Sequence, residues 1–190
     1  ETIVAEIQET DGGEAQEVSQ ETGYTLTDEE RQVLQKIYQV AENRDYEALT
    51  AAFLPEFARL YRMEREYFPN QYIIFDGENL STELEGYKLA ICTSSLTRTG
   101  GKNKGKVSYW VKGYLGNFTD GQPEGEILSF RNSYIDDKPA RDIDITLADY
   151  SQGKTVGTSE TESWHLNDDG SAACNFITTG AFDENGDPTG

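Results

Sequence analysis

Histidine, cysteine and methionine are scarce in this chain, and their scarcity argues against several kinds of site. There is one methionine, one histidine (His165) and two cysteines (Cys92 and Cys174) in 190 residues. A Ser-His-Asp or Cys-His catalytic arrangement needs His165, whose neighbours Trp164 and Leu166 indicate an ordinary strand position. The cysteines lie 82 positions apart, which fits no metal site of the C-x-x-C kind. We predict no metal site and two free thiols, with a disulfide as the alternative in an oxidising compartment.

Basic residues are few, which argues against nucleic acid as a partner. The chain has 16 lysines and arginines against 35 aspartates and glutamates, a formal net charge of −19. Nucleic acid and anionic lipid bind basic surfaces, so this charge repels both. No apolar run approaches the roughly 18 residues that cross a bilayer, so we predict no direct membrane insertion. Because the sequence begins at Glu1, we expect that an upstream segment was removed.

Apolar residues are limited too, at 36%, but aromatic residues reach 11% and there are 18 glycines. So much glycine without a collagen period indicates many tight turns. The fold class we predict is α+β: a short N-terminal helical segment followed by an antiparallel β-meander of hairpins. Residues 1–24 are predicted as a flexible acidic tether, 25–69 as the helical segment and 70–190 as the sheet. The tether prediction depends on ten acidic and no basic residues among positions 1–30.

Start and stop signals define the helices. Thr27 and Glu30 form the pattern of a capping box. The apolar stripe of an amphipathic helix follows at Val33, Leu34, Ile37, Tyr38 and Ala41. Asp45 is the expected N-cap of a second helix, and Pro55 fits the first turn of a third, which Pro69 ends.

From residue 71 on, alternation of period two predicts strands. The clearest pattern is Ile143, Ile145 and Leu147, separated by polar residues. Hairpin turns are predicted at two dipeptides, Asp76-Gly77 and Asp169-Gly170. After the second turn, Ala172, Cys174 and Phe176 are expected on one face of a strand.

The pattern Gly-x-x-x-Gly occurs four times. Its leading glycines are Gly101, Gly121, Gly153 and Gly186, at intervals of 20, 32 and 33 residues. The first glycine of each pair supplies a positive φ in a turn, and the second is expected to permit close approach of neighbouring backbones. The unequal intervals predict a degenerate repeat of hairpins that differ in length.

The best copy runs from Tyr114 to Gly125, YLGNFTDGQPEG, and resembles the MORN repeat, a stacked β-hairpin unit. A looser copy runs from Gly180 to Gly190, and residues 101–105 form a third fragment. The family's closing glycine is replaced by Ile127 in the best copy. The resemblance implies a scaffolding or partner-binding role, and it carries over no catalytic residue. No phosphate-binding glycine loop or dinucleotide fingerprint is present, so no cofactor is predicted.

The stretch from Tyr87 to Thr119 reverses the charge of the chain, with six basic residues and no acidic one. We take its basic and aromatic side chains as a candidate binding face: Lys102, Lys104, Lys106, Tyr109, Trp110, Lys112 and Tyr114. Such a face suits an anionic cell-envelope polymer or an acidic protein partner. The alternative is a set of solvated strand positions, where lysine discourages edge-to-edge pairing.

Three classes of function remain open. The first is a non-catalytic interaction or scaffolding module, exported to the cell surface, for example as a lipoprotein. The second is a pocket for a small ligand, because residues 30–53 resemble the first helices of nuclear-transport-factor-2-like domains, in which a curved sheet forms a cone. The third is a carboxylate-based glycan hydrolase, for which the many acidic residues supply pairs by chance.

Overall fold

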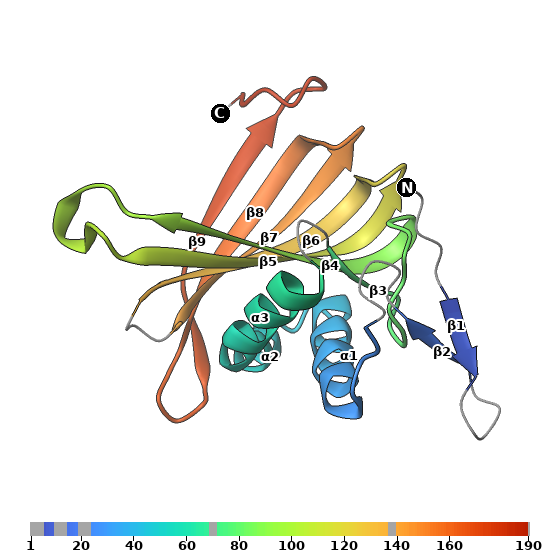
Figure 1. Cartoon of the computed structure of the whole chain (residues 1–190). Helices are drawn as coiled ribbons and strands as arrows, with labels where there is room; N and C mark the ends of the chain where they lie inside the picture. The colour runs from blue at the N-terminus through green and yellow to red at the C-terminus, as the bar shows by residue number, and fades with distance from the viewer. Residues whose placement is uncertain (1–5, 10–14, 19–23, 69–71, 137–139, 190) are drawn as a thin grey trace.

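The computed structural model describes residues 6–9, 15–18, 24–68, 72–136 and 140–189. Within them, three α-helices precede a seven-stranded antiparallel sheet whose strands follow one another in chain order, β3 to β9. Figure 1 shows the helices against one face of a twisted sheet. The predicted α+β class, with a short helical segment followed by an antiparallel meander, is therefore confirmed.

The helices begin where the sequence provides caps. Helix α1 (Asp28–Glu42) has Thr27 as its N-cap, and both hydrogen bonds of the capping box with Glu30 are present. Helix α2 (Tyr46–Phe53) begins at Asp45, which accepts a hydrogen bond from the backbone N–H of Ala48. The 3-10 turn η1 (Leu54–Glu56) contains Pro55 and leads into α3 (Phe57–Tyr67). The expected stop at Pro69 lies outside the described residues.

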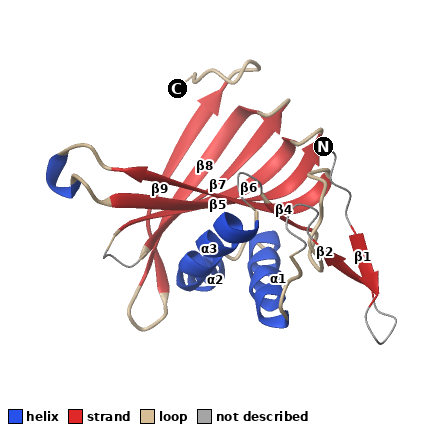
Figure 2. Cartoon of the chain, viewed as in Figure 1, coloured by secondary structure: helices blue, strands red, loops and turns tan. Residues whose placement is uncertain are grey.

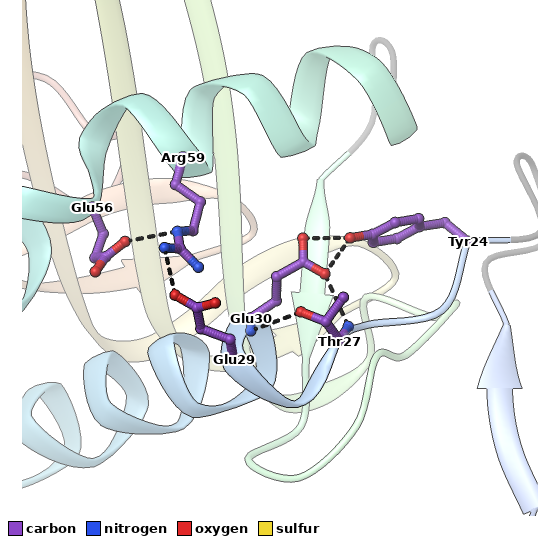
Figure 3. A network of polar contacts seen from close by, with 6 residues as sticks. All are labelled: Tyr24, Thr27, Glu29, Glu30, Glu56 and Arg59. Atoms are coloured by element: carbon purple, nitrogen blue, oxygen red, sulfur yellow. Dashed lines mark hydrogen bonds and ion pairs between the residues drawn. The ribbon is translucent and has the colours of Figure 1, made fainter.

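A polar network joins the start of α1 to α3 (Figure 3). Arg59 of α3 donates to Glu29 at 2.8 Å and lies 3.0 Å from Glu56. The Tyr24 hydroxyl donates to Glu30, and the Tyr24 ring stacks on Tyr67 with 3.9 Å between ring centroids. Burial, and then the hydrogen bond to Glu30, raise the pKa of Tyr24 above its usual range.

The strands are long except at one edge. Their bounds are β3 (Ile73–Phe75), β4 (Gly86–Thr97), β5 (Val107–Thr119), β6 (Gln122–Ile135), β7 (Asp142–Ser151), β8 (Lys154–Leu166) and β9 (Ala172–Phe182). A 3-10 turn, η2 (Gly101–Asn103), lies between β4 and β5. Figure 2 shows this turn at the tip of a hairpin that projects beyond the rest of the sheet.

The main core lies between the helices and the sheet face that they cover, here named the inner face. Ring contacts connect the two layers: Phe53 with Phe130, and Phe57 with Tyr134, each at 5.0 Å between centroids. Gly113 lies opposite Phe130, and a Cβ on Gly113 would be 2.3 Å from Cζ of that ring. The buried Phe130 ring therefore leaves no room for any side chain at position 113, so glycine is required there.

The predicted turns at Gly121 and Gly153 lie at the same end of the sheet, because alternate connections of a meander share an end. Both have a positive φ at the glycine and at the residue before it, as type I′ turns require. The second glycines, Gly125 and Gly157, have φ of +76° and +68°, and no atom lies within 4 Å of a Cβ built on either. The expectation of close backbone approach is wrong for these two, because their backbone conformation is what requires glycine.

Three local details differ from the sequence predictions. Asp76-Gly77 does not form a two-residue hairpin, because it opens a longer loop in which Asp76 accepts hydrogen bonds from two backbone N–H groups. A register shift places Cys174 opposite Trp164 and Phe176 opposite Ser163, so these two side chains lie on opposite faces. Within the acidic N-terminal segment, β1 (Glu6–Glu9) and β2 (Ala15–Val18) pair antiparallel, which the sequence did not predict.

Candidate functional site

The candidate site lies on the outer face of the sheet, which faces away from the helices. Lys112 of β5 lies directly opposite Arg131 of β6, and Arg131 lies opposite Asp144 of β7. Side chains alternate between the two faces of a strand, so Trp110 and Tyr114 lie on the same face as Lys112. Two cationic side chains and two aromatic ones therefore meet over neighbouring strands.

Two adjoining depressions form this site, and both contain Lys112 and Arg131. We name them together the outer-face hollow. The first, of about 380 Å³, also has Cys92, Ser94, Leu96 and Trp110 in its wall. The second, of about 180 Å³, also has Ser129, Asp144, Thr146 and Thr161. Hydroxyl groups thus border the two cations from β4 to β8.

The cations of the outer-face hollow have few partners within the protein. None of the ion pairs among the described residues involves Lys112 or Arg131. Lys112 Nζ lies over the ring of Tyr114, 4.7 Å from its centroid. Like charges directly opposite each other destabilise a sheet, and the single carboxylate of Asp144 opposite Arg131 offsets only part of the charge of the two cations.

Burial affects two titratable groups beside these cations. It raises the pKa of Tyr114 to about 12, although the charge of Arg131 acts in the other direction. The Tyr114 hydroxyl therefore stays protonated near neutral pH and can donate a hydrogen bond. Burial also raises the pKa of the Cys92 thiol, against the opposing effect of Lys112. Cys92 is thus a neutral wall residue rather than a reactive thiolate.

The structure brings together only part of the predicted binding face. Trp110 and Lys112 line the hollow, and Tyr114 lies beside it, with its ring under Lys112 Nζ. Tyr109 is on the inner face, 5.1 Å from Tyr61 of α3 between ring centroids, and belongs to the core packing. The remaining three predicted residues lie away from the hollow, in the connection between β4 and β5: Lys102, Lys104 and Lys106.

Arg131 was missed by the sequence reasoning because it lies outside the basic window from Tyr87 to Thr119. If the pairing continued regularly from Thr119 and Gln122 at the turn, Ser129 would lie opposite Lys112. A register shift between Leu115 and Asn117 moves the pairing by two residues and brings Arg131 there instead. Gly116 and Gly125, which both lie at the shift and both have a positive φ, are its local signals in the sequence.

Other titratable groups lie outside this hollow. The largest of the hollows described here, about 560 Å³, includes Glu126, Asp149 and Glu160, and Glu126 forms an ion pair with Arg44. His165 and Asp142 form an exposed contact of 2.9 Å between Nδ1 and Oδ1. The described residues hold no cluster of three or more histidine, cysteine, aspartate or glutamate side chains placed to bind a metal.

Two buried polar groups lie within the helix–sheet layer. The carboxylate of Glu64 accepts a hydrogen bond from Thr93, and burial raises its pKa. The side-chain nitrogen and oxygen of Asn132 have no hydrogen-bond partner in the part of the chain that the structure describes. Both cysteines are free thiols, in agreement with the sequence prediction.

Among the helices that the structure describes, none is long and apolar enough to span a bilayer. Comparisons with protein-family models, with curated proteins and with solved structures gave no match to this chain.

Proposed function

We propose that the protein is a non-catalytic interaction module that binds an anionic polymer through the outer-face hollow. One observation carries this proposal: Lys112 and Arg131 lie opposite each other without an ion pair among the described residues, in a chain of net charge −19. A protein with 35 carboxylates could neutralise both cations internally. Leaving them free in a hollow provides a local attraction for an anion, at some cost in stability.

The side chains around the two cations fit a polymer built of sugars or polyols that carry phosphate or carboxylate groups. Arginine holds such groups through two parallel hydrogen bonds, and lysine acts as a point charge. The half-buried Trp110 offers an apolar ring face. The Ser129 hydroxyl can donate or accept a hydrogen bond, and the hydroxyls of Thr146 and Thr161, which are bonded to each other at 2.8 Å, can accept one. The hollow extends across several strands, which suits an extended chain rather than one small anion.

Two further features of the proposal concern architecture and location. We infer that hairpins β5–β6 and β7–β8 are copies of one MORN-like unit. The similar turns at Gly121 and Gly153 support this, as do the register shifts near Gly125 and Gly157. Export to the cell surface would bring the hollow to an envelope polymer. Fractionation of cells that produce the full-length protein tests that location, and a cytosolic protein would contradict it.

Binding of defined polymers tests the proposed function. We expect the protein to bind polygalacturonate or polyphosphate in isothermal titration calorimetry at low salt, and not neutral dextran. The double variant Lys112→Gln/Arg131→Gln should lose at least about tenfold in affinity, since two charge-assisted contacts disappear. Added salt should weaken the remaining binding.

A matched variant separates the hollow from overall charge. Lys36→Gln/Lys154→Gln removes the same two charges from exposed positions in α1 and β8. This variant should bind the anionic polymers with an affinity within about twofold of that of the wild type. Equal losses in the two double variants, or no binding of either anionic polymer by the wild type, would overturn the proposal.

A further inference from the structure

The last strand of the sheet, β9, has an open edge. It pairs with β8 alone among the strands of the sheet (Figure 1). Beyond β9 the chain turns back, and Thr189 N–H donates to the Ala181 carbonyl at 2.8 Å, so the end of the edge is covered. A register shift at Ser163/Trp164 interrupts its beginning. The regular open part therefore runs from Phe176 to Gly180.

This edge lacks the usual protection against added strands. Natural edge strands carry charged residues or proline, or are very short. From Ala172 to Phe182 the sequence, AACNFITTGAF, has no charged residue and no proline. Phe176 and Ile177 are each 57% exposed, on opposite faces. By contrast, the other edge strand, β3, has three residues, and a bridge between Phe75 and Leu80 covers part of it.

The surroundings of the open edge are strongly acidic. Residues 155–190 contain no lysine or arginine. They contain seven carboxylates: Glu160, Glu162, Asp168, Asp169, Asp183, Glu184 and Asp187. Two of these lie one strand in from the edge, since Glu162 is opposite Ile177 and Glu160 is opposite Thr179.

We propose that the β9 edge binds an extended segment of a basic partner protein, which adds to the sheet as an eighth strand. Backbone hydrogen bonds to the open part of β9 supply the attachment. Every second side chain of the added strand lies on the inner face, where a long lysine or arginine can reach toward Glu160 and Glu162. Its other side chains, apolar or β-branched, pack beside Phe176 and Thr178 on the outer face.

The same charges disfavour a second copy of this chain as the occupant. Two β9 edges that pair antiparallel would bring Asp169, in the turn before β9 of one copy, near Asp183 of the other, and the ion pair of the neighbouring Asp168 with Arg141 leaves the Asp169 charge in place. The net charge of −19 on each chain adds to this repulsion. This inference uses the β9 edge alone and does not depend on the outer-face hollow.

A peptide of defined sequence tests the proposal with the full chain. The probe is a blocked nine-residue peptide of alternating lysine and valine, labelled for fluorescence anisotropy. We expect saturable binding at low salt and slower amide exchange in residues 176–180 of the protein. A peptide with glutamate in place of every lysine should bind at least about tenfold more weakly.

Two protein variants test whether the peptide binds at the β9 edge. Ile177→Lys places a charge on the edge and opposes a basic strand, so it should weaken peptide binding at least about tenfold. Thr97→Lys is the control, because Thr97 is an exposed residue of β4 outside the outer-face hollow, and it should leave binding unchanged. Binding without slower exchange in β9, equal binding of the acidic peptide, or self-association of the wild type through β9 would each overturn the proposal.

Discussion

At the scale of the residue, the buried carboxylate of Glu64 is the clearest case of a group held at a cost. It lies in α3 at 3% exposure, accepts a hydrogen bond from Thr93 and has Arg65 Nε at 3.9 Å. Burial disfavours the charged form and raises the pKa, while the contacts with Thr93 and Arg65 act in the opposite direction. Because the folded state binds this proton more tightly than the unfolded state, protonation favours folding.

Replacement of Glu64 by glutamine should therefore stabilise the protein near neutral pH. Glu64→Gln keeps the shape and an acceptor for Thr93 but removes the buried charge. We expect a higher urea midpoint than wild type at pH 7. The advantage should shrink as the pH falls through the raised pKa, and it should vanish below 4.5, the usual value for glutamate, where both states of the wild type bind the proton.

Glu66→Gln provides the comparison for Glu64→Gln, since Glu66 is an exposed carboxylate on the same helix. It should change the midpoint much less. A Glu64→Gln protein that is less stable than wild type at pH 7 would show that the carboxylate stabilises the fold.

At the scale of the element, the hairpins β5–β6 and β7–β8 combine a tight turn with a glycine in the return strand. In β6 that glycine, Gly125, lies where the pairing with β5 shifts register. The shift decides that Arg131, and not Ser129, lies opposite Lys112. The backbone conformation at Gly125 thus affects which residue faces Lys112 at the candidate site, six residues further along β6.

Substitution of Gly125 should test this conformation directly. Its φ is +76° and a Cβ there would meet no atom within 4 Å, so the cost of a side chain is backbone strain alone. We expect Gly125→Val to lower the free energy of unfolding by about 1–2 kcal/mol and Gly125→Asn by less, because asparagine tolerates this region. Urea denaturation measures both.

Gly100→Val is the matched control for the Gly125 series. Gly100 also has open space around it, but its φ of −152° is ordinary extended backbone. Valine there should change stability by less than about 0.5 kcal/mol. If valine were equally tolerated at positions 100 and 125, the positive φ at Gly125 would not be a requirement of the fold.

At the scale of the whole molecule, the net charge of −19 opposes the compact state. Acidic residues surround the β9 edge, while a group of lysines and arginines lies at the outer-face hollow and at the β4–β5 hairpin. Repulsion among the carboxylates is long-ranged at low ionic strength and is screened by salt. The outer-face hollow therefore favours anionic partners, and the β9 edge favours basic ones.

Salt should therefore stabilise the protein while it weakens binding of an anionic polymer. We expect the Tm at pH 7 to rise by several degrees between about 10 mM and 500 mM sodium chloride, as screening relieves the repulsion. Differential scanning calorimetry measures this change. The gain should shrink as the pH approaches the sequence pI of about 4.3, where the net charge disappears. A Tm at pH 7 that does not change with salt would contradict this account.

The sequence by itself determined the elements whose causes are local. The capping box of Thr27 and Glu30 and the N-cap at Asp45 act within four residues, so the starts of α1 and α2 followed from the sequence. Alternation predicted the buried positions Ile143 and Ile145 of β7, since side chains of a strand alternate between its faces. Net charge is a sum over residues and needs no structure.

Only the tertiary structure decided which residues of different strands and layers are neighbours. Tyr109 and Trp110 are neighbours in the sequence, but the helix layer covers one of them and leaves the other at the hollow. Lys112 meets Arg131 because a register shift, set by pairing along the whole hairpin, moves the partner strand by two residues. Register depends on the sum of contacts between strands that are distant in the chain, so residue spacing alone leaves it open.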